Sequence, residues 1–316
     1  MKPKPEIEPV DLHRVRTTPL AERASKVATA DFAAAWTPGG SFADFLTRMP
    51  AVLAGADLKS AIAAVAAAAR ARRPVIFGMG AHVIKVGLGP VVVDLMERGI
   101  LTGVAMNGAG IVHDLEVAMV GRTSEDVGPS LDDGSFGMAR DTGDFLGRAV
   151  AGGEGGLGRS VGGAILAAGL PFAAKSILAT GRRLGLPVTV HVAVGTDIIH
   201  MHPGFDPART GAASHFDFRL LAAEVADLEG GVYINAGSAV ILPEVFLKAL
   251  SVARNLGHRV DEFTTLNLDF IRHSRPMQNV VTRPTARGGR GISLIGHHEI
   301  MIPLIAAGVI EALAGV

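Results

Sequence analysis

The chain has no cysteine among its 316 residues, which excludes disulfide bonds, thiolate metal sites and a cysteine nucleophile. The formal net charge is zero, with 30 basic and 30 acidic residues, so there is no extended field of one sign to hold nucleic acid. The N-terminus lacks the apolar core of a signal peptide. No apolar stretch approaches the roughly 20 uninterrupted residues of a membrane span. We therefore expect a cytoplasmic protein without a nucleic-acid or membrane partner.

From residue 57 onward, short apolar runs rich in valine and isoleucine alternate with helical stretches. This alternation predicts a Rossmann-like, doubly wound α/β fold, with a mostly parallel sheet covered on both faces. Residues 1–56 are expected to form an N-terminal arm with one or two short helices, and residues 57–316 a single α/β domain. Strands are expected at 75–79, 104–107, 188–194, 232–236 and 262–268, and helices at 57–70, 86–97, 114–120, 161–184, 216–228, 242–256 and 299–313.

Three regions interrupt this alternation: 121–159, 200–214 and 273–291. The first is the longest, and a loop of that length in a compact domain is usually a functional lid or an interface element. The third carries four arginines. These regions are expected to be irregular, with short helices in the first.

Glycine-containing turns follow the first two expected strands. In parallel sheets, such turns face the crevice at the carboxyl ends of the strands, where nucleotides bind. The first turn predicts cofactor contacts from Gly80 and His82, and the second from Asn107, Gly108 and Gly110. The second turn leads into a helix whose positive end favours an anion. His113 is a candidate catalytic residue there, and Asp114 is expected to cap that helix.

The next two strand ends complete the predicted groove. Asp197 follows the third strand, where a carboxylate commonly holds a ribose hydroxyl, and Gly237 and Ser238 follow the fourth. A metal site is an alternative for the loop after Asp197, because imidazole and carboxylate groups are metal ligands; its candidate ligands are His200, His202, Asp206 and His215. We favour no metal, since a histidine pair on an irregular loop has many other roles. The pair at 297–298 is expected to cap the last helix.

The order and content of these turns resemble those of deoxyhypusine synthase, an NAD-dependent enzyme that moves an aminobutyl group from spermidine to a protein lysine. Residues 76–115 resemble its first NAD-binding unit, with Asn-Gly-Ala-Gly at 107–110 in place of Thr-Ala-Gly-Gly. Residues 187–197 resemble its strand ending in Thr-Asp, 231–240 the strand that enters its triple-glycine turn, and 275–276 its C-terminal portion. The resemblance covers roughly residues 60–316. It implies NAD as cofactor, a transferase activity, and a homotetramer with active sites between subunits.

The departures from that family concern its chemistry. The family requires a lysine near its C-terminal motif to form an imine, whereas this chain has no lysine after Lys248 and places Arg283 nearest. The tryptophan beside that lysine is missing too, because Trp36 is the only one. His202 and Gln278 fall near positions where the family has acidic residues that clamp a polyamine.

These departures favour a divergent, NAD-binding protein of this family with altered or lost aminobutyl transfer. Its candidate catalytic residues are His113, His202 and Arg283, and the arginines at 275, 283, 287 and 290 suggest a small anionic substrate. Two alternatives stay open. One is a genuine deoxyhypusine or homospermidine synthase with a displaced lysine, and the other is a non-catalytic, nucleotide-binding oligomer.

Overall fold

The computed structural model describes residues 7–315, so the first six residues of the predicted arm and Val316 lie outside the described part. Its core is a parallel six-stranded sheet in the order β3-β2-β1-β4-β5-β6, which confirms the predicted Rossmann-like fold. The strands are β1 (Val75–Met79), β2 (Gly103–Asn107), β3 (Val188–His191), β4 (Val232–Ala236), β5 (Thr264–Asp269) and β6 (Arg290–Ile295). Since β2 and β4 flank β1, the direction of winding reverses there.

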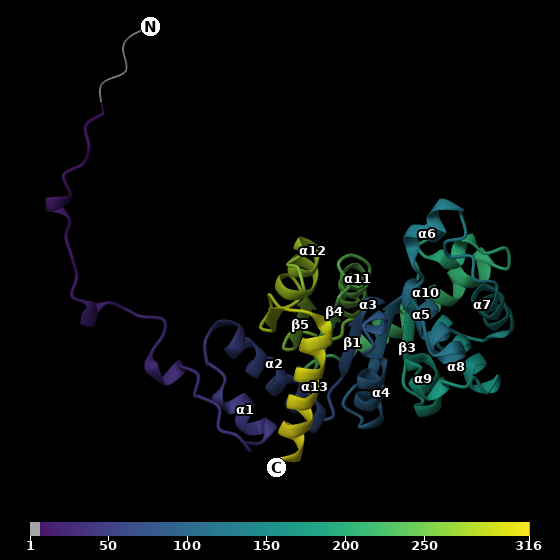
Figure 1. Ribbon diagram of the computed structural model, residues 1–316, viewed down its shortest axis with the longest axis horizontal. Helices are drawn as coiled ribbons and strands as arrows, with labels where there is room; N and C mark the ends of the chain where they lie inside the picture. The colour runs from purple at the N-terminus through teal and green to yellow at the C-terminus, as the bar shows by residue number, and fades with distance from the viewer. Residues whose placement is uncertain (1–6, 316) are drawn as a thin grey trace, which may run out of the picture.

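Helices connect the strands and cover both faces of the sheet (Figure 1). The longer ones are α1 (Phe42–Arg48), α2 (Leu53–Arg70), α4 (Gly89–Glu97), α5 (Gly108–Val120), α7 (Arg140–Gly152), α8 (Leu157–Ala167), α9 (Ile177–Leu184), α10 (Pro207–Ala226), α11 (Ile241–Asn255) and α13 (His298–Ala314). Shorter segments are α3 (His82–Lys85), α6 (Val127–Asp132), α12 (Ser274–Pro276), the π-helical η6 (Met277–Thr282), and the 3-10 turns η1 (Leu12–Arg14), η2 (Leu20–Glu22), η3 (Thr29–Asp31), η4 (Ala173–Lys175) and η5 (Ile198–Met201).

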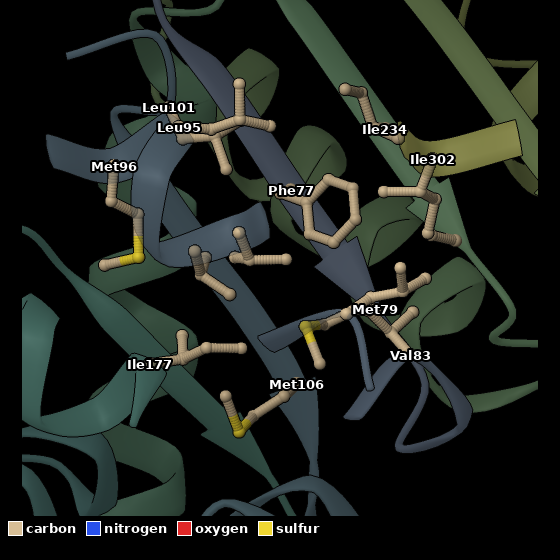
Figure 2. Close-up of a cluster of buried hydrophobic side chains, with 14 of the residues drawn as sticks. Phe77, Met79, Val83, Leu95, Met96, Leu101, Met106, Ile177, Ile234 and Ile302 are labelled. Atoms are coloured by element: carbon tan, nitrogen blue, oxygen red, sulfur yellow. The ribbon is translucent and has the colours of Figure 1, made fainter. Parts of the chain in front are cut away.

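The two faces of the sheet differ in chemistry. The face under α2, α4, α9 and α13 is apolar, and Figure 2 shows its centre, where Phe77 and Met79 of β1 meet Ile302 of α13. Burial of such side chains stabilises the fold by roughly 1.5–3 kcal/mol each. The opposite face, under α10 and α11, carries polar residues among its apolar ones, including Asn235 and Asn267. A hydrogen bond of 2.8 Å joins these two amides.

The predicted helix 161–184 is wrong, because two helices, α8 and α9, occupy this stretch. Gly169 takes the left-handed conformation (φ +57°) and Pro171 follows it, a combination that ends helices. Ser176 then caps α9 by accepting a hydrogen bond from the Ala179 N–H.

Asp114 is not the N-cap that the sequence predicted, because α5 begins six residues earlier, at Gly108, with Asn107 as its cap. The carboxylate of Asp114 lies inside α5 and accepts hydrogen bonds from the Ile177 and Leu178 N–H groups and from the Ser176 hydroxyl. Asp114 therefore anchors the start of α9.

Other boundaries also differ from the prediction. β3 ends at His191 rather than at 194, and α10 begins at Pro207 rather than at 216. Within the expected irregular region 273–291, β6 begins at Arg290 and η6 adds a π-helical turn. β6 escapes pattern recognition because it lies at the edge of the sheet, with only Ile292 and Leu294 buried.

The described part of the N-terminal arm extends away from the sheet domain (Figure 1). Its apolar side chains are exposed, among them Ile7, Leu12, Leu20 and Trp36. Near the end of the arm, α1 packs against α13, and Leu46 and Met49 contact the core. No helix within residues 7–315 is both long and apolar enough to cross a bilayer.

Candidate functional site

The carboxyl ends of β1 and β4 form the reversal point of the sheet, which is where ligands bind in folds of this kind. The turn after β1 contacts the end of β4, because the Gly80 N–H donates to Ala236 O (2.9 Å). The turn after β4 in the same way contacts β5, because the Gly237 N–H donates to Leu268 O (2.9 Å). A Cβ atom added to Gly80 would lie 2.4 Å from Gly237 O. Glycine at 80 is therefore required by the close approach of two backbones, and these two predicted cofactor residues are brought together.

Two imidazoles lie over this turn. The rings of His82 and His298 are 5.4 Å apart, and the His298 Cε1 atom would be 2.6 Å from a Cβ at Gly237. Burial and the neighbouring His298 lower the pKa of His82. The ring of Phe270, after β5, lies 6.0 Å from that of His82 and completes an aromatic wall.

His298 does not cap the last helix as the sequence predicted. Its ring is fully buried, with Nε2 3.2 Å from Leu268 O, and Nδ1 has no hydrogen-bond partner within residues 7–315. His297 occupies the cap position but makes no side-chain capping bond. His298 therefore places a buried polar nitrogen beside the turns of β4 and β5, without a hydrogen-bond partner in the described part of the chain.

At the turn after β2, side chains rather than close backbone contacts hold the chain in place. Asn107 caps α5 by accepting from the Gly110 N–H (3.0 Å). The carboxylate of Asp197 reaches this turn from the loop after β3, so close that a Cβ at Gly108 would lie 2.1 Å from its Oδ2. Burial raises the pKa of Asp197, although hydrogen bonds from the Ala193 and Ala109 N–H groups oppose this. The predicted cofactor residues 107, 108 and 197 thus form one cluster.

His191 lies beside this cluster and was missed by the sequence reasoning. It pairs in register with Asn107, and its Nε2 lies 3.0 Å from Thr189 Oγ1. Burial lowers the pKa of His191 to about 4, so the ring is neutral at physiological pH. The sequence feature that could have indicated His191 is a polar residue in the last position of a buried strand.

His113, a predicted catalytic residue, lies in a polar cluster between α5, the following loop and α7. Its Nδ1 is 2.6 Å from Thr123 Oγ1, and the Thr123 hydroxyl donates to Glu116. Thr142 of α7 donates to the other oxygen of Glu116 (3.3 Å). Burial acts to raise the pKa of Glu116, but the bonds from His113 and Thr123 outweigh it and the net shift is downward. This arrangement leaves Nε2 of His113 without a partner among the described residues, as a potential base.

His202, the second predicted catalytic residue, is held against α7. Its ring fills the space that a Cβ of Gly143 would occupy, and its Nε2 lies 3.7 Å from Asp144 Oδ1. It also borders a cavity of about 30 Å³, room for about one water molecule. A second small cavity is lined by both His202 and Thr142, so His202 lies near the cluster around His113 but makes no hydrogen bond with it among residues 7–315.

The histidines proposed as alternative metal ligands make separate contacts. The His200 ring packs on Phe205 (4.7 Å between centroids), and that of His215 on Phe218 (6.4 Å). Within residues 7–315, no three histidine, aspartate or glutamate side chains gather into a metal-binding group.

The arginines of 275–290 do not converge. Arg283, the third predicted catalytic residue, donates to Asn279 Oδ1 (2.9 Å). Arg275 pairs with Glu244 near the start of α11, whereas Arg290 donates to Ser60 Oγ (2.8 Å) at the amino end of the sheet. Arg275 and Arg283 are linked through Asn279, whose Nδ2 donates to Glu244 (2.8 Å). Arg290 lies apart from this network, because the segment runs from the carboxyl end of β5 down to the amino end of β6.

Ser238 has a structural role at the fourth turn. Its hydroxyl accepts from the Leu242 N–H (3.1 Å) at the start of α11, and its carbonyl accepts from Asn235 Nδ2 (2.9 Å). Asn235 Oδ1 is buried without a partner in the described residues. The sequence reasoning missed Asn235 and Asn267, although amides inside apolar strands are a recognisable signal of a polar network.

Fold and site together define an α/β protein with a Rossmann-like sheet and a glycine-lined reversal point. The sequence matches no protein-family model and no curated protein. Among solved structures, a conserved putative LOR/SDH protein from Methanococcus maripaludis S2 is similar over 92% of this chain and 75% of its own, with a TM-score of 0.55 and 13% identity.

Two further structures share the fold. A putative deoxyhypusine synthase from Entamoeba histolytica aligns over 86% of this chain and 94% of its own (TM-score 0.54, 10% identity). AgrE, in a ternary complex with ornithine and NAD+, aligns over 82% of this chain (TM-score 0.53, 12% identity), and the match occupies 33% of the AgrE chain. At these identities the similarity shows the fold alone.

Proposed function

We propose that this chain binds NAD at the β1/β4 reversal point, and that its deoxyhypusine-synthase-like scaffold acts on a small anionic substrate without aminobutyl transfer. The observation that carries the proposal is the close approach of the turns at Gly80 and Gly237: a side chain on Gly80 would collide with Gly237 O, and one on Gly237 with the His298 ring. Turns of this kind let backbone N–H groups approach a phosphate closely.

The residues at this point fit a dinucleotide. Gly80 and Gly237 keep the turns free of side chains, and Asp197 presents a carboxylate beside the end of β2, where a ribose hydroxyl can donate to it. The unpartnered His298 Nδ1 offers a further polar contact. NAD would supply a hydride acceptor; the chain's own residues would bind it, exclude water and handle protons.

His113 is the proposed base. Thr123 and Glu116 hold its Nδ1 side, which orients the ring and leaves Nε2 to take a proton from a substrate. The proposed catalytic roles of His202 and Arg283 rest on the family resemblance alone. His202 contacts Asp144 and Arg283 contacts Asn279, and neither hydrogen-bonds to His113 in the described part of the chain.

The proposed loss of aminobutyl transfer is supported by the surroundings of Lys85 and Lys248. Lys248 pairs with Glu244 on the surface of α11, and Lys85 is exposed on α3. Forming an imine requires a desolvated amine, whereas both of these side chains are exposed to solvent. The guanidinium of Arg283 cannot replace it.

A homo-oligomer, with a tetramer as the form implied by the resemblance, belongs to the same proposal. Exposed apolar side chains follow β4, β5 and β6 at the carboxyl edge: Val240, Phe270, Ile271, Ile295 and Ile300, each about half exposed. Clusters of this kind mark interaction surfaces. Light scattering should give a mass above the 32.6 kDa of one chain, and a monomeric mass would contradict this part.

Calorimetric titration of NAD tests the proposed function. We expect saturable binding to the wild-type protein, at least tenfold weaker binding to Asp197→Asn, and unchanged binding to the surface control Glu154→Gln. Spermidine-dependent NADH formation would instead revive a genuine deoxyhypusine or homospermidine synthase. Tight NAD binding with no turnover across a screen of carboxylates and phosphates would favour the non-catalytic oligomer.

A further inference from the structure

A second recess lies at the outer edge of the sheet, beside the first residue of β3. This recess, hereafter the β3 groove, has a volume of about 340 Å³, within the roughly 300–1,000 Å³ typical of small-molecule sites. Its walls come from the start of α8, the end of α9 and the middle of α10. Because Pro187 and Val188 form part of its lining, it opens at the amino end of β3, opposite the turns that hold the proposed NAD site.

The groove carries two arginines whose charges are not matched by the protein. Arg159 of α8 and Arg182 of α9 both line it, and both are exposed. Neither guanidinium makes an ion pair or a hydrogen bond with any residue between 7 and 315. The adjacent Arg183, which does not line the groove, is paired with Glu97. The two groove arginines are therefore available to a ligand.

The one acidic residue in the lining does not neutralise them. Asp217 of α10 is 1% exposed, and its carboxylate accepts hydrogen bonds from the Gly158 N–H (3.1 Å) and the Val190 N–H (2.9 Å). Burial raises the pKa of Asp217 to about 7, so its negative charge is incomplete at neutral pH. The groove as a whole therefore favours an anion.

The remaining lining is apolar and partly aromatic. Leu186 and Leu220 contribute aliphatic surface, and Phe216 is 38% exposed. The Arg219 guanidinium carbon lies 5.6 Å from the centroid of that ring. A fully hydrated inorganic ion would leave this surface unused, whereas a flat apolar group can pack on it.

We propose that the β3 groove is a second ligand site, which binds a small organic anion: a carboxylate or phosphate monoester that carries a flat ring. Arg159 and Arg182 bind the anionic group by charge-assisted hydrogen bonds, and Phe216 with the leucines contacts the ring. This site is independent of the NAD proposal, because it shares no residue with the reversal point.

Fluorine NMR with 4-fluorophenyl phosphate and 4-fluorobenzoate tests this proposal on the full-length protein. We expect saturable line broadening for at least one of the two probes, and about tenfold weaker binding to both Arg159→Gln and Arg182→Gln. Both arginines are exposed, so the variants should fold, which circular dichroism checks. Arg183→Gln is the matched control, because it removes a neighbouring guanidinium that lies outside the groove, and it should bind like the wild type.

Three results would overturn the proposal: no saturable binding of either probe, equal losses in Arg183→Gln and the groove variants, or competition by inorganic phosphate as strong as that by the aryl compounds. Asp197→Asn separates the two sites. It should weaken NAD binding and leave the fluorinated probes unaffected, whereas loss of probe binding in this variant would place the anion at the reversal point and refute the groove.

Discussion

The buried carboxylate of Asp114 should make the protein less stable as the pH rises from acid to neutral. Asp114 is completely buried, and burial raises its pKa to about 6, although the Ser176 hydroxyl and the Ile177 and Leu178 N–H groups oppose this rise. In the unfolded chain the same group should titrate with the ordinary aspartate pKa of about 3.8. Between these two values the folded state binds one more proton than the unfolded state, so stability is lost as the pH increases through 6.

The size of this effect follows from the difference between the two pKa values. Each unit corresponds to about 1.4 kcal/mol, which gives roughly 3 kcal/mol in total and about 2 kcal/mol between pH 4.5 and 8. The substitution Asp114→Asn removes the titration while keeping the size of the side chain. It should cost about 1–2 kcal/mol at pH 4.5, because the amide cannot accept from every donor that the carboxylate serves.

Urea unfolding of both proteins at pH 4.5 and pH 8 measures the effect. The stability of Asp114→Asn relative to the wild type should improve by about 2 kcal/mol at the higher pH. Contributions from other buried acids cancel in this comparison. Asp132→Asn, at an exposed position on α6, should show no such change. A difference between wild type and Asp114→Asn that is the same at both pH values would refute the reasoning.

Three further predictions concern the turns, the proposed base and the polar face of the sheet. Gly80→Ala should lower the free energy of unfolding by about 1–3 kcal/mol, because the new methyl group would press on Gly237 O. Thermal unfolding measures this loss, and an unchanged melting temperature would contradict the close approach of Gly80 to Gly237. Thr123→Val should change the tautomer balance of His113 seen in its imidazole 15N shifts, whereas Thr123→Ser should preserve it; identical spectra would contradict the hydrogen bond. Burial and the neighbouring Asp217 raise the pKa of Glu224 well above its usual range, so Glu224→Gln should lose less stability than the wild type between pH 5 and pH 9. Urea unfolding at the two pH values measures this, and equal losses in the wild type and the variant would contradict the raised pKa.

Most of the fold could be predicted from the sequence, because buried parallel strands leave a strong local signal. Val75–Met79 and Val232–Ala236 are mainly apolar and buried throughout, and both agree with the predicted bounds. β6 could not be found in this way, since only alternate residues of this edge strand are buried. The start of α10 was missed although Asp206 and Pro207 form a regular cap and first turn.

Of the candidate site, the sequence predicted the glycine turns at the ends of the strands. Glycine turns after strands are visible in a sequence, and Gly80, Gly108 and Gly237 all prove to lie at close backbone or side-chain contacts. His191 was not predicted, and His298 was expected to cap a helix, because the surroundings of both residues depend on which strands become neighbours. Pairing between distant segments leaves no local pattern.

Hydrogen–deuterium exchange with and without NAD measures whether the cofactor binds at the β1/β4 reversal point. We expect slower exchange of backbone amides in peptides covering 80–85, 107–112 and 237–242, because these turns would contact the cofactor. Peptides covering the β3 groove, 156–160 and 181–188, should exchange at the same rate in both samples. Protection confined to the groove peptides, or no protection at saturating NAD, would contradict binding at the reversal point.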